Sequence, residues 1–269
     1  MIFSYSDGAS FIEENGAYLS ENTYMSSFFF LDAPLLKETS KKNYAIKVYD
    51  ENTQLLAMKV EPYFLMLYGD KTLLKELLIF IKNNELEIEG AYCATELGEE
   101  LLGLSQEILN KEYYQQIGMD FMETKDITEP SSNEIEIPTL NDVDEIVECL
   151  INFISDCGLT DKVERENVIK TLSTYRIIRL DNKIASLARK SPESDSSTRI
   201  SMVYTRPEYR NKGLARKIVN YLKNEIISED KIATLNVDQA NPISNHLYQS
   251  LGFKKVFSRG IFVPKISND

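Results

Sequence analysis

The stretch RISMVYTRPEYRNKGLARKIVNYL, residues 199–222, gives the strongest local signal in this chain of 269 residues. Residues 199–205 predict a strand. Pro207 should end that strand, because proline cannot donate a hydrogen bond to a neighbouring strand. Residues 213–226 predict a helix, so the seven residues 206–212 form a long turn between strand and helix.

The composition of this turn suits an anion. Gly213 lets the backbone turn tightly into the helix, and the small Ala215 permits close approach from outside. The start of a helix presents unpaired N–H groups and a partial positive charge. Five cationic side chains surround this start, namely Arg206, Arg210, Lys212, Arg216 and Lys217. Amides and cations together suit a pyrophosphate, and the alternative is a solvated basic turn before an amphipathic helix.

A second segment, LNVDQANPISNHLYQSLGFKKV at residues 235–256, predicts the end of a strand followed by a short helix. Asn241 is a good N-cap, and the proline after it fits the first helical position. Ser244 and Tyr248 are four residues apart, so they share one face of the helix expected at residues 242–251. An amide, a hydroxyl and a phenol therefore project near one end and one side of this helix.

The rest of the second half supplies further strands and helices. Thr139 and Asp142 have the spacing of a capping box, which predicts a helix up to about residue 156. Asp181-Asn182 predicts a hairpin turn. Further strands are expected at residues 135–138, 175–180, 183–189, 232–237 and 255–263, and a further helix at residues 161–172. A meander of strands followed by strand, helix, strand and helix indicates a mixed α/β sheet.

The first half repeats this order weakly. Strands are expected at residues 44–49, 54–60, 63–68 and 87–93, and helices at residues 71–81 and 95–109. We therefore expect a diverged internal duplication in two domains, residues 1–127 and 135–269, joined by a polar linker at residues 128–134. The turn that leads into the helix at 71–81 is only Gly69-Asp70, so the first half cannot do what the longer turn does.

Together, the two motifs resemble those of the GNAT acetyltransferase superfamily. The match is R-x-x-G-x-A at residues 210–215, where Ala215 replaces the more frequent glycine, and N-P-x-S-x-x-x-Y-x-x-x-G-F at residues 241–253. Both segments look like those of two-domain members whose amino half is a degenerate copy of the fold. The resemblance implies two GNAT-like domains, each with a central, mostly antiparallel sheet flanked by helices, and one active site in the second.

The resemblance also implies acetyl-CoA as the cofactor and a role for each matched residue. In the family, the strand matching residues 203–205 splays from its neighbour and hydrogen-bonds the pantetheine arm. The loop matching residues 210–215 binds the pyrophosphate through main-chain N–H groups. The implied cofactor-binding residues are Val203, Tyr204, Thr205, Arg210, Asn211, Lys212, Gly213, Leu214, Ala215, Asn241 and Ser244.

Tyr248 matches the usual general acid of the family. A leaving thiolate needs a proton, and a phenol of pKa about 10 can supply it. The alternative is a packed aromatic ring with its hydroxyl at the surface. Asp238 and Glu208 are the candidates for the general base. Asp238 could instead cap a turn, and Glu208 could instead be an exposed surface carboxylate. His246, the only histidine, is expected to be exposed and not catalytic.

These residues predict an N-acyltransferase that moves acetyl from acetyl-CoA to a primary amine of a small molecule or peptide, by direct attack in a ternary complex. A second hypothesis is a non-catalytic acyl-CoA-binding or regulatory module that keeps only the cofactor site. A nucleotide-binding protein is disfavoured, because neither GxxxxGK[ST] nor GxGxxG occurs in the chain.

The net charge indicates which kinds of ligand and acceptor the protein could bind. The chain has 30 Lys and Arg against 42 Asp and Glu, a net charge of −12, which argues against nucleic acid as a ligand. Residues 1–134 carry 10 basic and 24 acidic side chains, a net charge of −14, whereas residues 135–269 carry 20 and 18, a net charge of +2. An acidic first half beside the acceptor cleft would favour a cationic amine.

Cysteine usage and the first residues suggest the compartment. The spacing of the three cysteines fits neither a disulfide framework nor a metal site. The first ten residues have no basic region and no long apolar run, so neither a signal peptide nor a membrane segment is expected. We therefore expect a cytoplasmic protein, as a monomer or homodimer.

Overall fold

The computed structural model describes residues 1–127, 132–158 and 161–265, and only the backbone of residues 23–25. Two compact units result, Met1–Met119 with Phe257–Asp269, and Asp120–Val256. They differ from the expected domains because two strands, β6 (Tyr113–Thr124) and β11 (Lys254–Pro264), contribute residues to both units. Residues 128–131 of the expected linker lie outside the described residues.

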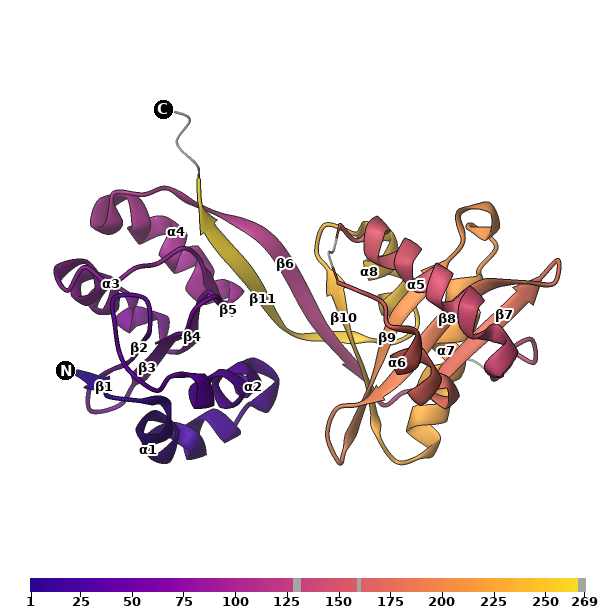
Figure 1. Cartoon of the computed structure of the whole chain (residues 1–269), viewed down its shortest axis with the longest axis horizontal. Coiled ribbons are helices and arrows are strands. Elements are labelled where there is room, and N and C mark those ends of the chain that lie inside the picture. The colour runs from indigo at the N-terminus through magenta and orange to yellow at the C-terminus, as the bar shows by residue number, and fades with distance from the viewer. Residues whose placement is uncertain (128–131, 159–160, 266–269) are drawn as a thin grey trace. The chain divides into compact units, whose positions relative to one another are not determined.

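Unit 1 is a sheet covered by helices on both faces. Its elements are β1 (Ile2–Tyr5), α1 (Gly8–Ser20), α2 (Thr23–Asp32), β2 (Tyr44–Tyr49), β3 (Gln54–Lys59), β4 (Leu65–Gly69), α3 (Leu74–Asn83), β5 (Ala91–Ala94) and α4 (Thr95–Leu109). The strand order is β1-β2-β3-β4-β5-β11, and only β4 and β5 pair in parallel. Helices α1 and α2 cover one face, and α3 and α4 cover the other (Figure 1).

The apolar run of β3 explains this layering. Leu55 and Ala57 pack into the core beneath α3 and α4, whereas Leu56 and Met58 pack beneath α1 and α2. All four side chains are fully buried. A strand that is buried on both faces is apolar at successive positions, which is why the sequence here does not alternate.

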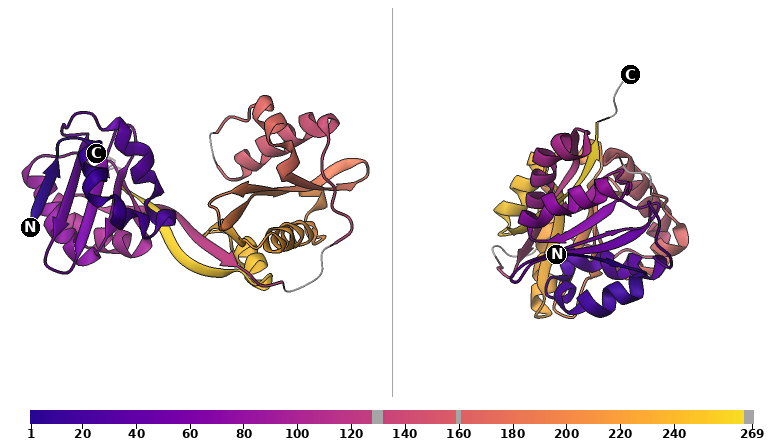
Figure 2. Two further views of the ribbon diagram at one scale, coloured as in Figure 1. Left: turned by 90° about the horizontal axis from the view of Figure 1, so that it is seen from below. Right: turned by 90° about the vertical axis from the view of Figure 1, so that its left-hand side faces the viewer.

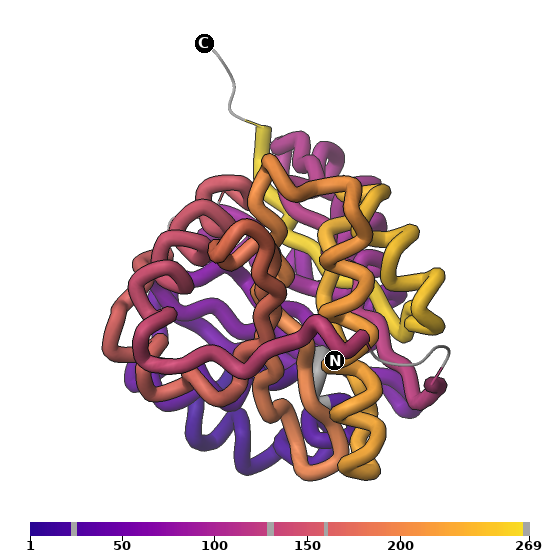
Figure 3. Tube along the Cα trace, turned by 90° about the vertical axis from the view of Figure 1, so that its right-hand side faces the viewer, coloured from indigo at the N-terminus to yellow at the C-terminus, as the bar shows by residue number. Residues whose placement is uncertain are grey.

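Unit 2 has the same kind of layering. Its elements are α5 (Val143–Asp156), α6 (Arg165–Lys170), β7 (Tyr175–Leu180), β8 (Lys183–Pro192), β9 (Ser197–Thr205), α7 (Leu214–Ser228), β10 (Ile232–Asp238) and α8 (Pro242–Ser250). The strand order is β6-β10-β9-β8-β7, with β9 and β10 parallel and β7, β8 and β9 antiparallel. Helices α5 and α6 lie on one face and α7 and α8 on the other (Figures 2 and 3).

Several local predictions are confirmed, as is the mixed α/β sheet. The Thr139 backbone N–H donates to the Asp142 carboxylate (2.6 Å), and both bonds of the capping box are present. Asp181 and Asn182 have φ values of 52° and 60°, the left-handed pair that a tight hairpin requires. Strong signals carried by adjacent residues therefore gave the correct local structure.

Other predictions were wrong in extent. The helix expected at residues 161–172 covers only Arg165–Lys170, where Val168 is the single buried residue and little apolar contact supports more turns. The strand expected at residues 135–138 is reduced to an isolated bridge between Glu136 and Ile177. Strand β6 was not predicted, because its mixed polar and aromatic residues lack a clear period of two.

Candidate active site

Strands β9 and β10 pair over only part of their length. Their parallel register covers three residue pairs and ends at Arg199 and Thr234. Beyond this point β9 continues through residues 200–205, which pair with β8 on the other edge as far as Thr205. Among the residues that the structure describes, the edge that faces β10 therefore has no ladder partner over residues 200–205, and its backbone groups are available to a ligand.

A β-bulge lies within this unpaired part of β9. Met202 has a φ of +54°, and the register with β8 shifts between Leu187 and Arg189. Met202 and Val203 together lie opposite Ala188. A bulge bends a strand and changes the direction of the side chains that follow it. A methionine gives no sequence signal for a bulge, so sequence analysis missed it.

The three residues after the bulge are fixed by their neighbours. Tyr204 is buried in the core on the α5 side, and Val203 packs on the side of α7 and α8. The Ser186 hydroxyl donates to the Tyr204 carbonyl (2.9 Å) and contacts the Thr205 hydroxyl (2.9 Å). The end of β9 is therefore held from the β8 side while its other edge stays open.

The turn after β9 presents a row of open amides. Asn211 and Gly213 have left-handed φ values of 62° and 74°, and Leu214, which begins α7, is buried. Among the described residues, the N–H groups of residues 211–215 have no hydrogen-bond partner. Successive free amides at a helix start form a concave anion site. The phosphate-binding role of residues 210–215 stays a prediction.

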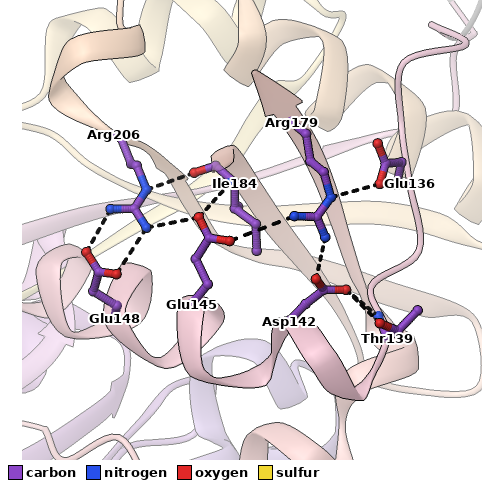
Figure 4. Close-up of polar contacts among 8 residues, drawn as sticks. All are labelled: Glu136, Thr139, Asp142, Glu145, Glu148, Arg179, Ile184 and Arg206. Atoms are coloured by element: carbon purple, nitrogen blue, oxygen red, sulfur yellow. Dashed lines mark hydrogen bonds and ion pairs between the residues drawn. The ribbon is translucent and has the colours of Figure 1, made fainter. Parts of the chain in front are cut away.

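Arg206 does not lie at this helix start, so its expected place among the cations around the turn was wrong. Its side chain is 11% exposed and donates to the Glu148 carboxylate and to the Ile184 carbonyl (Figure 4). Glu148 of α5 is exposed and Ile184 of β8 is buried. The separation of 58 residues between Arg206 and Glu148 concealed this pair from sequence analysis.

The other four cations of the turn are also engaged. Arg210 donates to Asp156 (2.6 Å) and to the Thr205 carbonyl (3.1 Å). Lys217 pairs with Glu134 (2.6 Å). Arg216 donates to the Ser250 hydroxyl (2.7 Å), and the Lys212 ammonium lies 5.1 Å from the centre of the Tyr209 ring. The positive field at the helix start is therefore weaker than the count of cations predicts, and the amides are its main anion-binding groups.

The second motif forms the start of α8. As predicted, Asn241 is the N-cap, and its side-chain oxygen accepts from the Ser244 backbone N–H (3.0 Å). Tyr248, one turn after Ser244, is 7% exposed and packs edge-on against Phe253 with ring centres 6.2 Å apart. The amide, hydroxyl and phenol are thus fixed by one short helix.

Burial raises the pKa of Tyr248 to about 12. The Cys157 thiol adds to this rise, and the Ser244 side chain opposes it. The phenol therefore remains protonated across the physiological range. It can donate a hydrogen bond to a developing anion at neutral pH.

Both sequence candidates for the base, Asp238 and Glu208, are exposed. Asp238 is exposed and accepts from the Ala240 backbone N–H (2.8 Å), as a turn carboxylate does. Glu208 is exposed in the short 3-10 turn Pro207–Tyr209. His246 is exposed, as expected.

The end of α5 adds two residues that sequence analysis missed. Partial burial raises the pKa of the Cys157 thiol, and the carboxylates of Asp156 and Asp238 raise it further. Cys157 in turn raises the pKa of Tyr248. These four side chains therefore share one electrostatic neighbourhood, although nothing in the sequence around Asp156 and Cys157 indicates it.

The residues present fit coenzyme A. The open edge of β9 at residues 203–205 offers backbone groups to an amide-containing arm, and the free N–H groups of residues 211–215 suit a pyrophosphate. The described part of the chain contains no cluster of His, Cys, Asp and Glu that could hold a metal ion. Within the same residues, none of the helices has the length and apolar character to cross a bilayer.

Solved acetyltransferases share this fold. An acetyltransferase of the GNAT family from Colwellia psychrerythraea aligns over 99% of this chain and 100% of its own, with 11% sequence identity and a TM-score of 0.64. A GCN5-related N-acetyltransferase from Sphaerobacter thermophilus aligns over 84% of this chain and 82% of its own, with 14% identity and a TM-score of 0.54. The chain therefore has the GNAT fold, and the first of these matches extends over both units.

A family model adds a match at the level of sequence. Residues 180–261 match the model described as FR47-like protein, which is related to the GNAT acetyltransferases. No curated protein matches the chain in sequence. The chain is therefore similar to GNAT acetyltransferases in fold over both units, and similar in sequence to the FR47-like model over residues 180–261.

Proposed function

We propose that this protein is an N-acyltransferase that moves acetyl from acetyl-CoA to a primary amine of a small molecule or peptide, with its active site in unit 2. The observation that carries the proposal is the combination of the open β9 edge with the free amides of residues 211–215. Both features are backbone groups that the protein leaves unsatisfied, which is costly unless a ligand or water pairs with them.

Each part of the site would hold a different part of the cofactor. The backbone of Val203, Tyr204 and Thr205 would bind the pantetheine arm. The turn at residues 210–215 would bind the pyrophosphate through its N–H groups, and Asn241 and Ser244 would lie beside the arm. When bound, acetyl-CoA supplies an acetyl group activated as a thioester.

Tyr248 would assist departure of the thiolate. As the amine nitrogen bonds to the carbonyl carbon and the C–S bond breaks, the sulfur leaves as a thiolate and the nitrogen gives up one proton to solvent water. The phenol has a pKa of about 12, above the value of about 8.5 for an ordinary thiol. Tyr248 therefore acts best as a hydrogen-bond donor that stabilises the developing thiolate and then shares its proton with it.

Thiol release from acetyl-CoA across a panel of primary amines tests the proposal, with Tyr248→Phe as the variant. Turnover should fall by about 10²- to 10⁴-fold while CoA affinity changes little. Tyr113→Phe is the matched control, because Tyr113 is also buried with a pKa raised to about 12, but lies in unit 1 and donates to the Ile88 carbonyl. Equal turnover of the two variants would contradict the role of Tyr248.

A second candidate function is a non-catalytic acyl-CoA-binding or regulatory module. It is favoured by the engagement of the nearby carboxylates, because Asp156 pairs with Arg210 and Asp238 caps a turn. Binding of CoA by the parent protein without thiol release on any amine would support this function over the transferase.

The charge around Tyr248 favours a cationic acceptor. The carboxylates of Asp156 and Asp238 act on the Cys157 thiol, and Cys157 in turn acts on Tyr248. Negative potential raises the local concentration of cations. The amine panel should therefore include polyamines and anionic amines, and a clear preference for the anionic ones would contradict this assignment.

A further inference from the structure

Arg206 stands at the point where β9 ends and the turn begins. Its backbone N–H donates to the Ala185 carbonyl (3.0 Å), and its own carbonyl accepts from the Tyr209 N–H (2.9 Å). The first hydrogen bond joins Arg206 to strand β8, and the second closes the turn that follows. The direction in which the chain leaves the sheet is therefore set at Arg206.

The side chain of Arg206 is clamped to α5. Nη1 and Nη2 donate to the two carboxylate oxygens of Glu148 (2.8 and 3.2 Å), and Nη2 also contacts Glu145 (3.3 Å). Nε donates to the Ile184 carbonyl (2.8 Å), so all three nitrogens of the guanidinium are engaged. A bidentate pair of this kind fixes orientation as well as charge.

The clamp belongs to a larger network on one face of α5 (Figure 4). Asp142, Glu145 and Glu148 are spaced by three residues, which places them along one side of the helix. Arg179 of β7 pairs with Asp142 and Glu145, while Glu145 also accepts from the Ile184 backbone N–H (2.7 Å). The contacts of Arg206 therefore lie in a network that fixes α5 against β7 and β8.

A second contact ties the same turn to the end of α5. Arg210 donates to Asp156 (2.6 Å), eight residues after Glu148 along the helix. Its Nε donates to the Thr205 carbonyl (3.1 Å). The turn is thus held to α5 before and after the short 3-10 segment Pro207–Tyr209.

We propose that Arg206 is a positioning residue, whose clamp to Glu148 and Glu145 holds the turn so that the free amides of residues 211–215 face the phosphates, and that it does not bind the phosphates itself. Two carboxylates already contact the guanidinium, so it has no surplus charge to offer an anion. The proposal rests on the proposed function for the identity of the ligand, but the clamp can be tested without it.

The test compares Arg206→Gln, Arg206→Lys and Glu148→Gln with the parent. Each variant should raise the KM for acetyl-CoA by about 10- to 100-fold, with kcat at saturation little changed, because loss of positioning acts from a distance. Arg206→Lys should not restore KM, since an ammonium cannot make the bidentate contact. The double variant Arg206→Gln/Glu148→Gln should match the single variants, because both remove one interaction.

Hydrogen exchange of the amides in residues 207–215 gives a readout that needs no ligand. It should be faster in Arg206→Gln and in Glu148→Gln, with exchange in β7 and β8 unchanged. Arg165→Gln is the control, because it removes an arginine from the exposed pair with Asp144 on the same helix (2.7 Å). It should leave both KM and loop exchange as in the parent.

Two results would overturn the positioning role. One is a raised KM in Arg206→Gln together with an unchanged or lowered KM in Glu148→Gln, which is the pattern of direct phosphate binding by a freed arginine. The other is parental exchange of residues 207–215 in both variants. If the parent neither binds CoA nor releases thiol, the proposed function fails, and the exchange experiment still decides whether Arg206 orders the turn.

Discussion

Strand β4 in unit 1 and strand β9 in unit 2 occupy equivalent positions but lead into different turns. Each lies between an antiparallel and a parallel neighbour, and each leads through a turn into a helix, α3 after β4 and α7 after β9. After β4 the chain reaches the 3-10 turn Lys71–Leu73 through Asp70 alone, whereas after β9 it runs through residues 206–213 before α7 begins.

The shorter turn satisfies its own amides. The Asp70 carboxylate accepts from the Thr72 backbone N–H (2.8 Å) and from the Thr72 hydroxyl (2.6 Å), and these bonds lower the pKa of Asp70. At the start of α7, by contrast, the amides of residues 211–215 have no partner among the described residues. A helix start becomes an anion site only where the protein does not cap it with its own carboxylate.

Gly69→Ala should cause the largest loss of stability among these variants, and the loss should be limited to unit 1. Gly69 has a φ of +131°, and an added Cβ would lie 2.2 Å from the Gln54 carbonyl oxygen on the neighbouring strand. Strain and overlap together should lower the free energy of unfolding by about 4 kcal/mol. Calorimetry measures the loss, and the KM for acetyl-CoA should remain parental in the folded fraction. A shift in KM would mean that the two turns are not independent.

The two units can also be compared at high pH through one buried tyrosine in each. Tyr113 in unit 1 and Tyr248 in unit 2 both have a pKa raised from 10 to about 12 by burial. A tyrosine whose pKa is higher in the folded than in the unfolded state stabilises the fold fully below pH 10. This contribution to the free energy of unfolding is lost as the pH rises from 10 through 12. For a shift of two units in Tyr248 the loss is about 3 kcal/mol.

Phenolate absorbance recorded after a rapid pH jump measures these pKa values before the protein unfolds. The difference between the parent and Tyr248→Phe should titrate near pH 12, and so should the difference for Tyr113→Phe. Turnover should show no alkaline loss from Tyr248 up to pH 10. A midpoint near 10 for Tyr248 alone would mean that water reaches its hydroxyl in unit 2.

Local signals in the sequence predicted the local structure around the candidate site. The hairpin at Asp181-Asn182, the capping box at Thr139 and the N-cap at Asn241 all depend on residues within four positions of one another. The same short-range patterns gave the order of the other strands and helices, but they missed β1, α1, α2 and β6. These patterns placed the two motifs at a strand end and at two helix starts.

Long-range partners could not be predicted in the same way. Arg206 was counted as a cation of the turn because its carboxylates on α5 lie about 60 residues earlier, and the pairing of Arg210 with Asp156 was hidden for the same reason. The bulge at Met202 depends on the register with β8, which no local pattern encodes. Composition thus predicted the charges of the turn but not which of them the protein uses for its own structure.

Gly213→Ala should have a smaller effect on stability than Gly69→Ala but a larger one on binding. Gly213 has a φ of +74°, and an added Cβ would meet nothing within 4 Å, so the cost is conformational and about 1–2 kcal/mol. The KM for acetyl-CoA should rise because the amides that follow shift. Gly213→Asn should recover part of both losses, since asparagine tolerates this conformation.

Gly158→Ala is the control for strain alone. Gly158 has a similar φ of +65° and equally open surroundings, so its stability loss should match that of Gly213→Ala. If Gly213→Ala left KM unchanged while losing the same stability, the amides of the turn would not be the phosphate-binding groups.

Asp70→Asn should have the smallest effect on stability. It tests whether the negative charge of Asp70 alone explains why the turn after β4 is not expected to bind CoA. Asparagine caps a helix start about as well as aspartate, so stability at neutral pH should stay parental. Because the pKa of Asp70 is lowered in the folded state, its stabilising contribution is present above pH 3.8 and is lost as the pH falls below that value, a dependence that asparagine removes. CoA binding measured by calorimetry should not appear at unit 1, because the variant side chain still accepts the Thr72 N–H and the turn still lacks the row of open amides. A second CoA per chain in Asp70→Asn would show instead that one negative charge was all that kept unit 1 from binding.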